Sequence, residues 1–208
     1  MGRRGPSIAA LLPPEHRLRE RSRVPVLLTP GRAAGLAELI TLLATGAGTA
    51  ALATFVHFRL GIPGHQIVYS LFPMALGFAL VPRRRAGTVM GTGAVAAVMV
   101  FRIGGAAIGP GSLTSLVLAG PLLDLALRLG GRGRRLYGAF VIAGVTTNLI
   151  ALSVRGSAKA LEMGAMAGSR PFDSWLAEAV LTYPLAGLLA GGLSAAAWFQ
   201  LRAPRSGE

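Results

Sequence analysis

Polar side chains that could bind a small molecule lie within or at the ends of long apolar blocks of the sequence. They carry imidazole, amide, phenol, indole and cationic groups, which together can stack on, hydrogen bond to and neutralise a small, partly polar solute, anions included. Burying such groups costs several kcal/mol unless they are paired or hydrated, so we interpret them as functional candidates. The predicted solute-binding residues are His65, Gln66, Tyr69, Arg102, Asn148, Arg155, Lys159 and Trp175.

Each of these residues also has an ordinary structural interpretation. Arg155 and Lys159 would reach toward water from a membrane interface, where Trp175 and the second tryptophan, Trp198, would anchor their helix. Asn148 lies deeper in an apolar block, where an amide normally needs a partner.

Catalytic and metal-binding patterns are absent from the sequence. It has no cysteine, no G-x-S-x-G or H-E-x-x-H motif, and its histidines, His16, His57 and His65, are not at ligand spacing. No Walker motif is present either, so any ATP-driven step needs another chain. We predict no catalytic residue, no metal and no cofactor.

Two carboxylates near block ends have local interpretations. Asp124 and Arg128 are four residues apart, which predicts an ion pair along one helix face. Glu38 is expected to pair with an arginine at the same end of the protein. An intramembrane enzyme that uses Asp124 and Asn148 remains an alternative.

The composition is that of a membrane protein. Of the 208 residues, 52% are hydrophobic and 14% are charged, whereas soluble domains carry about a quarter charged residues. The apolar residues form blocks of near membrane-spanning length. We predict an all-α membrane protein with six transmembrane helices at about 33–58, 65–81, 87–108, 112–129, 136–154 and 175–201, with residues 155–174 as a loop that includes a short interfacial helix.

Basic residues are distributed unevenly between the gaps. With six spans, sixteen of the 21 Lys and Arg residues fall on one side and five on the other. Because basic residues concentrate in cytoplasmic segments, both termini are predicted to be cytoplasmic. This distribution also accounts for the net charge of +13, so we expect no nucleic-acid partner.

The chain divides into three parts. Residues 1–32 form a basic cytoplasmic arm that is expected to lie on anionic lipid, 33–201 form the transmembrane domain, and 202–208 form a short cytoplasmic tail. Small residues recur at four-residue spacing within the domain, which favours close helix packing inside the bundle or docking of a partner on the first helix. These pairs are Ala47/Ala51, Gly46/Ala50, Gly87/Gly91, Gly105/Gly109 and Gly187/Gly191.

Residues 33–201 resemble the substrate-binding membrane subunits, or S components, of energy-coupling factor transporters. The resemblance rests on length, on six helices with both ends inside, and on a Gly- and Ala-rich first helix that carries Ala47 and Ala51. It rests also on the segments 62–64 (Ile-Pro-Gly), 82–87 (Pro-Arg-Arg-Arg-Ala-Gly) and 119–124 (Ala-Gly-Pro-Leu-Leu-Asp).

The resemblance implies a subunit in the plasma (inner) membrane of a prokaryote that binds a vitamin or cofactor precursor near the outer face. It implies docking through Ala47 and Ala51 to a transmembrane coupling subunit attached to paired ATPases, and release of cargo by toppling of the whole subunit. The first outer loop, at about 59–64, is shorter than in many members. Members that take up cobalt or nickel carry a histidine after the initiator Met, whereas this chain has Gly2 and Arg3, which argues against a metal cargo.

Two further alternatives remain open from the sequence. An independent small transporter or channel would need no ATPase and would be expected to contain inverted repeats, which are not evident here. A membrane scaffold protein would use the outer polar residues only as anchors and would bind no solute.

Overall fold

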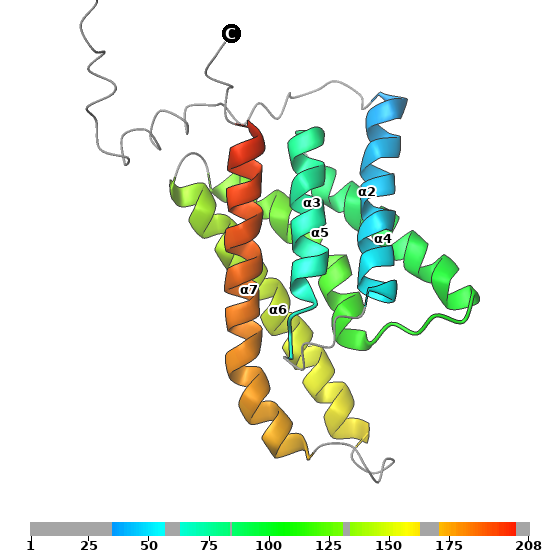
Figure 1. The fold of residues 1–208 in the computed structure, drawn as a ribbon, viewed down its shortest axis with the longest axis vertical. Helices are drawn as coiled ribbons and strands as arrows, with labels where there is room; N and C mark the ends of the chain where they lie inside the picture. Colours follow the sequence, from blue (N-terminus) through cyan, green and yellow to red (C-terminus); the bar gives the residue numbers. More distant parts are fainter. Residues whose placement is uncertain (1–34, 57–62, 84, 131–133, 163–170, 203–208) are drawn as a thin grey trace, which may run out of the picture.

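The computed structural model describes residues 35–56, 63–83, 85–130, 134–162 and 171–202. These residues form six helices and no strand, which confirms the predicted all-α class (Figure 1). The predicted arm 1–32 and the tail from 203 lie outside the described residues. The helices are α2 (Leu36–Phe55), α3 (Ile67–Leu80), α4 (Ala86–Ile103), α5 (Pro110–Leu129), α6 (Arg134–Glu162) and α7 (Phe172–Arg202).

Five of these helices are long and apolar enough to cross a membrane, which makes the chain a multi-pass membrane protein by length and composition. The exception is α3, which has 14 residues. At 1.5 Å per residue it is about 21 Å long, whereas the hydrocarbon core is about 30 Å thick. The predicted second span, 65–81, is longer than the helix because the chain turns through 63–66, with Gly64 at a φ of 85°, before α3 begins.

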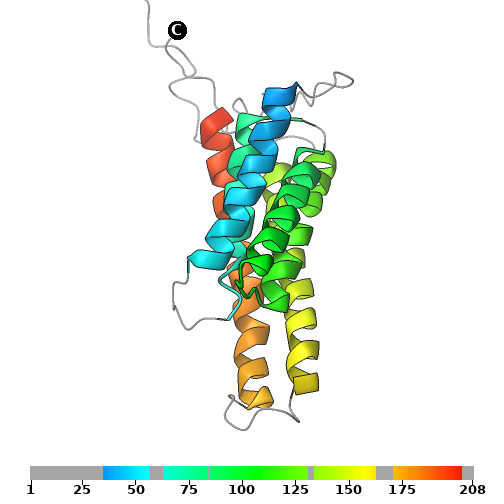
Figure 2. The same ribbon diagram turned by 90° about the vertical axis from the view of Figure 1, so that its right-hand side faces the viewer.

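Consecutive helices run in opposite directions (Figures 1 and 2). The start of α2 and the end of α7 therefore lie at the same end of the bundle, which we call the terminal end. The opposite end, where α6 ends at Glu162 and α7 begins at Phe172, is the hairpin end.

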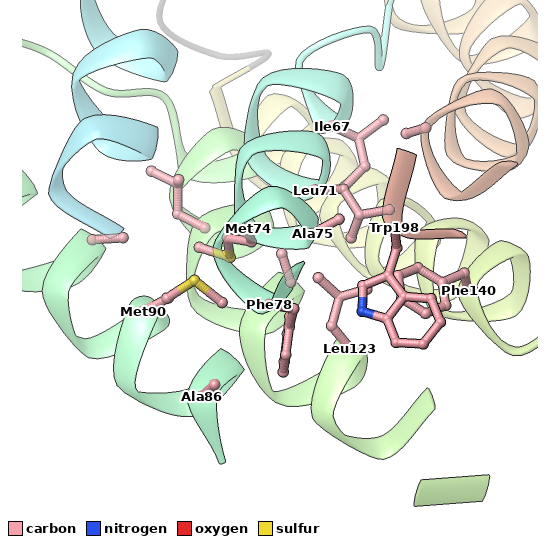
Figure 3. Packing of buried hydrophobic residues seen from close by; sticks show 14 of the residues in the cluster. Ile67, Leu71, Met74, Ala75, Phe78, Ala86, Met90, Leu123, Phe140 and Trp198 are labelled. Carbon is pink, nitrogen blue, oxygen red and sulfur yellow. The ribbon is translucent and has the colours of Figure 1, made fainter. Parts of the chain in front are cut away.

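Helix α3 lies at the centre of the bundle and packs against all five other helices. Its side chains Ile67, Leu71, Met74, Ala75 and Phe78 are at most 1% exposed and form the middle of the main core (Figure 3). The surrounding helices add large apolar side chains, including Met90, Leu123, Phe140 and Trp198. One face of α3 is thus buried in the core, whereas its outer face is partly exposed and Leu80 at its end is 69% exposed.

Glycines allow close backbone approach where the long helices cross. A Cβ built on Gly87 of α4 would lie 2.2 Å from the carbonyl oxygen of Gly120 in α5, and one on Gly144 of α6 would lie 2.3 Å from that of Gly187 in α7. A Cβ on Gly46 of α2 would meet the backbone of α4 in the same way. Most of the predicted small-residue pairs therefore serve internal packing.

Two of the predicted pairs lie elsewhere. Gly105 and Gly109 lie in the connection after α4, where a Cβ would meet nothing within 4 Å, so the prediction that they pack helices is wrong. Ala47 and Ala51 are partly exposed on α2, and Gly48 between them faces open space.

A buried carboxylate joins α5 to the start of α4 near the terminal end. Asp124, only 6% exposed, accepts hydrogen bonds from the Gly87 N–H (3.1 Å), the Thr88 N–H (2.7 Å) and the Thr88 hydroxyl (2.6 Å). It thus caps a helix N-terminus from a neighbouring helix. The predicted ion pair with Arg128 is wrong, because the carboxylate faces α4 and Arg128 is exposed.

An ion pair at the terminal end joins α2 to the end of α3. The Arg83 guanidinium lies 2.5 Å from the Glu38 carboxylate, which also accepts a hydrogen bond from the Gly35 N–H. The prediction that Glu38 pairs with an arginine at its own end of the protein is confirmed.

Replacing Gly144 by Ala should destabilise the bundle by about 1–3 kcal/mol, because the new methyl group meets backbone of α7 that cannot move without separating the helices. Gly138→Ala on the same helix is the control, since a Cβ there meets nothing within 4 Å. Thermal unfolding in detergent, followed by circular dichroism, compares the two. Equal midpoints for both variants would contradict the close crossing.

Replacing Asp124 by Ala should cost about 1–3 kcal/mol, because one buried and two partly buried donors at the start of α4 lose their acceptor. Arg128→Ala should change stability by less than about 0.5 kcal/mol, as expected for an exposed side chain outside this contact. Chemical unfolding of both variants measures the difference. Similar losses of stability in the two variants would indicate that Asp124 stabilises the protein through an ion pair with Arg128.

Candidate functional site

Helices α6 and α7 project beyond the other helices at the hairpin end (Figures 1 and 2). They have 29 and 31 residues, hence lengths of about 43 and 46 Å, well above the hydrocarbon thickness. The predicted loop 155–174 is therefore wrong over much of its length, because α6 continues to Glu162 and α7 begins at Phe172. Arg155 and Lys159 consequently occupy one face of a regular helix.

The indole of Trp175 is the centre of a small second core between α6 and α7. The ring is 5% exposed and packs with Ala151, Ala179 and Tyr183. Trp198 is also buried, at 4% exposed, and packs near Phe140. Both residues are covered by protein, which leaves little ring surface for the alternative interpretation of interfacial anchoring.

Two cations from α6 lie over Trp175. The Arg155 guanidinium carbon is 6.0 Å from the ring centroid and the Lys159 ammonium nitrogen is 5.4 Å from it. These distances are within the range of cation–π attraction. The sequence predicted all three residues, and the structure brings them into one cluster.

The start of α5 lies against this cluster. A Cβ built on Gly111 would lie 3.3 Å from Cβ and 3.5 Å from Cδ of Arg155, so the aliphatic part of that side chain crosses the first turn of α5. The next residue, Ser112, donates its hydroxyl hydrogen to Oε1 of Gln66. A contiguous set of contacts thus links the start of α3 to α5, α6 and α7.

His65 and Tyr69 extend the set along α3. Their rings are arranged edge to face, with centroids 6.1 Å apart, and both side chains are partly buried. His65 precedes Gln66 directly and Tyr69 follows it by three residues. The three solute-binding residues predicted at the start of α3 therefore all lie at the hairpin end of the bundle.

Asn148 holds this end of the bundle together. It is 1% exposed, and its amide nitrogen donates to the carbonyl oxygens of Gly64 (3.1 Å) and Tyr183 (2.7 Å). Both amide hydrogens are therefore used to fix the turn before α3 against α7. A role for Asn148 in solute binding stays a prediction, and a direct contact would fall to its amide oxygen.

Arg102 is the predicted residue that the structure does not bring into the cluster. It is exposed in the last turn of α4, and α4 packs against α2, α3 and α5 but not against α6 or α7. The C-terminal end of α4 points away from the hairpin end of α6 and α7 (Figure 1).

Four residues of the cluster were not predicted: Gly64, Gly111, Ser112 and Tyr183. Gly111 and Ser112 follow Pro110 at the start of an apolar block, a pattern that marks a helix N-terminus. That pattern was available in the sequence, whereas nothing local to Tyr183 shows that its carbonyl faces Asn148.

The arrangement is suited to binding rather than to an evident reaction. It offers hydrogen-bonding groups, an aromatic surface and two cations, all at one end of a helical bundle. No group of three or more His, Asp or Glu side chains that could hold a metal ion occurs in the described part of the chain. Searches of protein-family models, curated proteins and solved structures found no match to this chain.

Replacing Asn148 by Asp should destabilise the protein by about 2–4 kcal/mol, because a carboxylate oxygen would face two carbonyl oxygens where an amide now donates. Asn148→Ala removes the donors without adding charge and should cost less. Ser153→Ala, at an exposed position of the same helix, is the matched control. Thermal unfolding midpoints should fall in the order Ser153→Ala, Asn148→Ala, Asn148→Asp, and an unchanged midpoint for Asn148→Asp would contradict the assignment.

Proposed function

We propose that the chain is the membrane-embedded substrate-binding subunit of an energy-coupling factor importer for a small organic nutrient, a vitamin or cofactor precursor. The observation that carries this proposal is the convergence of Gln66, Arg155, Lys159 and Trp175, from three helices, at one end of the bundle. These polar groups gather around the start of α3. Such a grouping suits the recognition of a polar solute.

The charge distribution supports an outward orientation of this cluster. The helices alternate in direction, so the connection that contains Arg83 and Arg85 lies at the terminal end, with the start of α2. In the six-span arrangement, sixteen of the 21 basic residues belong to that end. By the positive-inside rule the terminal end is cytoplasmic, with both termini, and the hairpin end faces outward in the plasma membrane of a prokaryote.

Docking of a partner is proposed on α2. This helix is the least buried of the five that could span a membrane. Its partly exposed Ala47 and Ala51, with Gly48 between them in open space, form a surface on which another helix can approach closely. The sequence contains no nucleotide-binding motif, so the proposed partners are a transmembrane coupling subunit and paired ATPases.

Purification of the full chain from its own host in mild detergent tests this function. Native mass spectrometry should find coupling and ATPase subunits bound to the wild-type protein, together with a vitamin-sized molecule. Ala47→Leu and Ala51→Leu should lose the subunits, because a larger side chain keeps the partner helix away. Ala96→Leu, at an exposed position of α4, should retain them.

Thermal unfolding of each variant separates lost docking from lost folding. A wild-type protein that is folded but carries neither solute nor partner would contradict the proposed function. Equal retention of subunits by Ala51→Leu and Ala96→Leu would contradict the docking surface alone.

A further inference from the structure

Two like charges are held together at the hairpin end. Arg155, which is exposed, and Lys159, which is partly exposed, lie four residues apart on α6, and both side chains lie over the same indole ring. Like charges at this spacing destabilise a helix. The attraction of each cation for the ring of Trp175 is of the same order as this cost and holds the two positive charges near one another.

A third positive feature lies beside them. The aliphatic part of Arg155 crosses Gly111 in the first turn of α5. A helix that begins at Pro110 leaves the N–H groups of Gly111 and Ser112 without intrahelical acceptors, and the N-terminus carries partial positive charge. A cation at the N-terminal end of a helix is electrostatically unfavourable, so α5 adds to the repulsion.

No carboxylate of the described residues neutralises the two cations. Among the described residues, an ion pair joins Arg83 to Glu38, and the buried Asp124 carboxylate accepts hydrogen bonds from α4. Both carboxylates lie toward the terminal end. Asp173 begins α7 near Trp175 but is exposed and forms no ion pair with either cation. Neither cation therefore forms an ion pair with a carboxylate of the described residues, although Asp173 and Glu178 of α7 and Glu162 at the end of α6 belong to the same end of the bundle.

We propose that this cluster binds an anionic group, a carboxylate or phosphate, between the Arg155 guanidinium, the Lys159 ammonium and the N-terminus of α5. A bound anion would accept charge-assisted hydrogen bonds from both side chains and would remove the three repulsions at once. The anionic group belongs either to the transported solute, which rests on the proposed function, or to a lipid headgroup.

The test uses the full chain in nanodiscs of phosphatidylcholine, a zwitterionic lipid. Sodium phosphate or sodium succinate is titrated against sodium chloride at constant ionic strength, and tryptophan fluorescence reports ligand binding and thermal unfolding. Wild-type protein should respond saturably with a raised unfolding midpoint. Arg155→Met and Lys159→Met keep the aliphatic stem and remove the charge, so each should weaken apparent affinity about tenfold or more.

Arg102→Met is the control, because it removes an exposed arginine from a helix that does not contact α6 or α7. It should leave the titration unchanged. Without added anion, Arg155→Met and Lys159→Met should change the unfolding midpoint little, because the lost attraction to Trp175 and the relieved repulsion are of similar size. Lower midpoints in the absence of anion, combined with an unchanged titration, would mean that the cations only brace Trp175 and would overturn the proposal.

Nanodiscs that contain phosphatidylglycerol distinguish the two sources. Stabilisation by this lipid that needs Arg155 and Lys159, without a response to phosphate or succinate, assigns the anionic group to a headgroup. If no anion distinguishes Arg155→Met or Lys159→Met from Arg102→Met, the site does not exist. If the protein responds to anions but carries neither a nutrient nor partner subunits, the anion site stands and the proposed importer function fails. If it carries a neutral nutrient and does not respond to anions, the importer function stands and the anion site fails.

Discussion

Packing of the short helix α3 against all five other helices is the constraint on which the rest of the structure depends. A 14-residue helix is too short to cross a bilayer unaided, and its ends would leave backbone groups in hydrocarbon that offers no hydrogen-bond partner. All five other helices contact it, so one face of α3 is buried along its length, while residues on its outer face are partly exposed and Leu80 at its end is exposed. The close glycine crossings between α4 and α5 and between α6 and α7 are what bring these helices near enough to contact α3.

Polar groups fasten the bundle near both ends. Toward the terminal end, Asp124 of α5 accepts hydrogen bonds from the start of α4, and at the hairpin end Asn148 of α6 donates to the turn before α3 and to α7. Within the helices, hydroxyls such as those of Thr49 and Thr54 donate to the carbonyl four residues earlier. Each contact satisfies groups that cannot be hydrated in an apolar interior.

The sequence predicted the helices well because apolar blocks bounded by Gly, Pro and Arg are a local pattern. It failed where the partners are distant in the chain. The acceptor of the Gly87 N–H is 37 residues away, and one acceptor of Asn148 is 84 residues away. Spacing rules along a helix reach only four residues, so they offered Arg128 as the partner of Asp124. For the candidate site, they identified the cations and the indole but not the turn of α5 beside them.

The misassigned segment 155–174 shows a second limit. Charged residues after Val154 were interpreted as a loop because the apolar block ends there, yet the four-residue spacing of Ala151, Arg155 and Lys159 already placed them on one helix face. Polarity marks where a helix leaves hydrocarbon, whereas periodicity marks where the helix itself ends. In α6 these two points are separated by about two turns, and the candidate site occupies that interval.

The positive-inside rule explains the position of the basic residues at the terminal end better than that of the basic residues at the hairpin end. Under the proposed orientation, cytoplasmic connections attract Arg for a reason unrelated to any ligand, and Arg83 additionally finds a carboxylate in Glu38. The same rule disfavours cations on the outer side, where Arg155 and Lys159 lie over Trp175 and beside the N-terminus of α5. Arg155 and Lys159 are among the basic residues that this orientation does not explain; attraction to Trp175 and the proposed binding of an anion together give an electrostatic reason for their position.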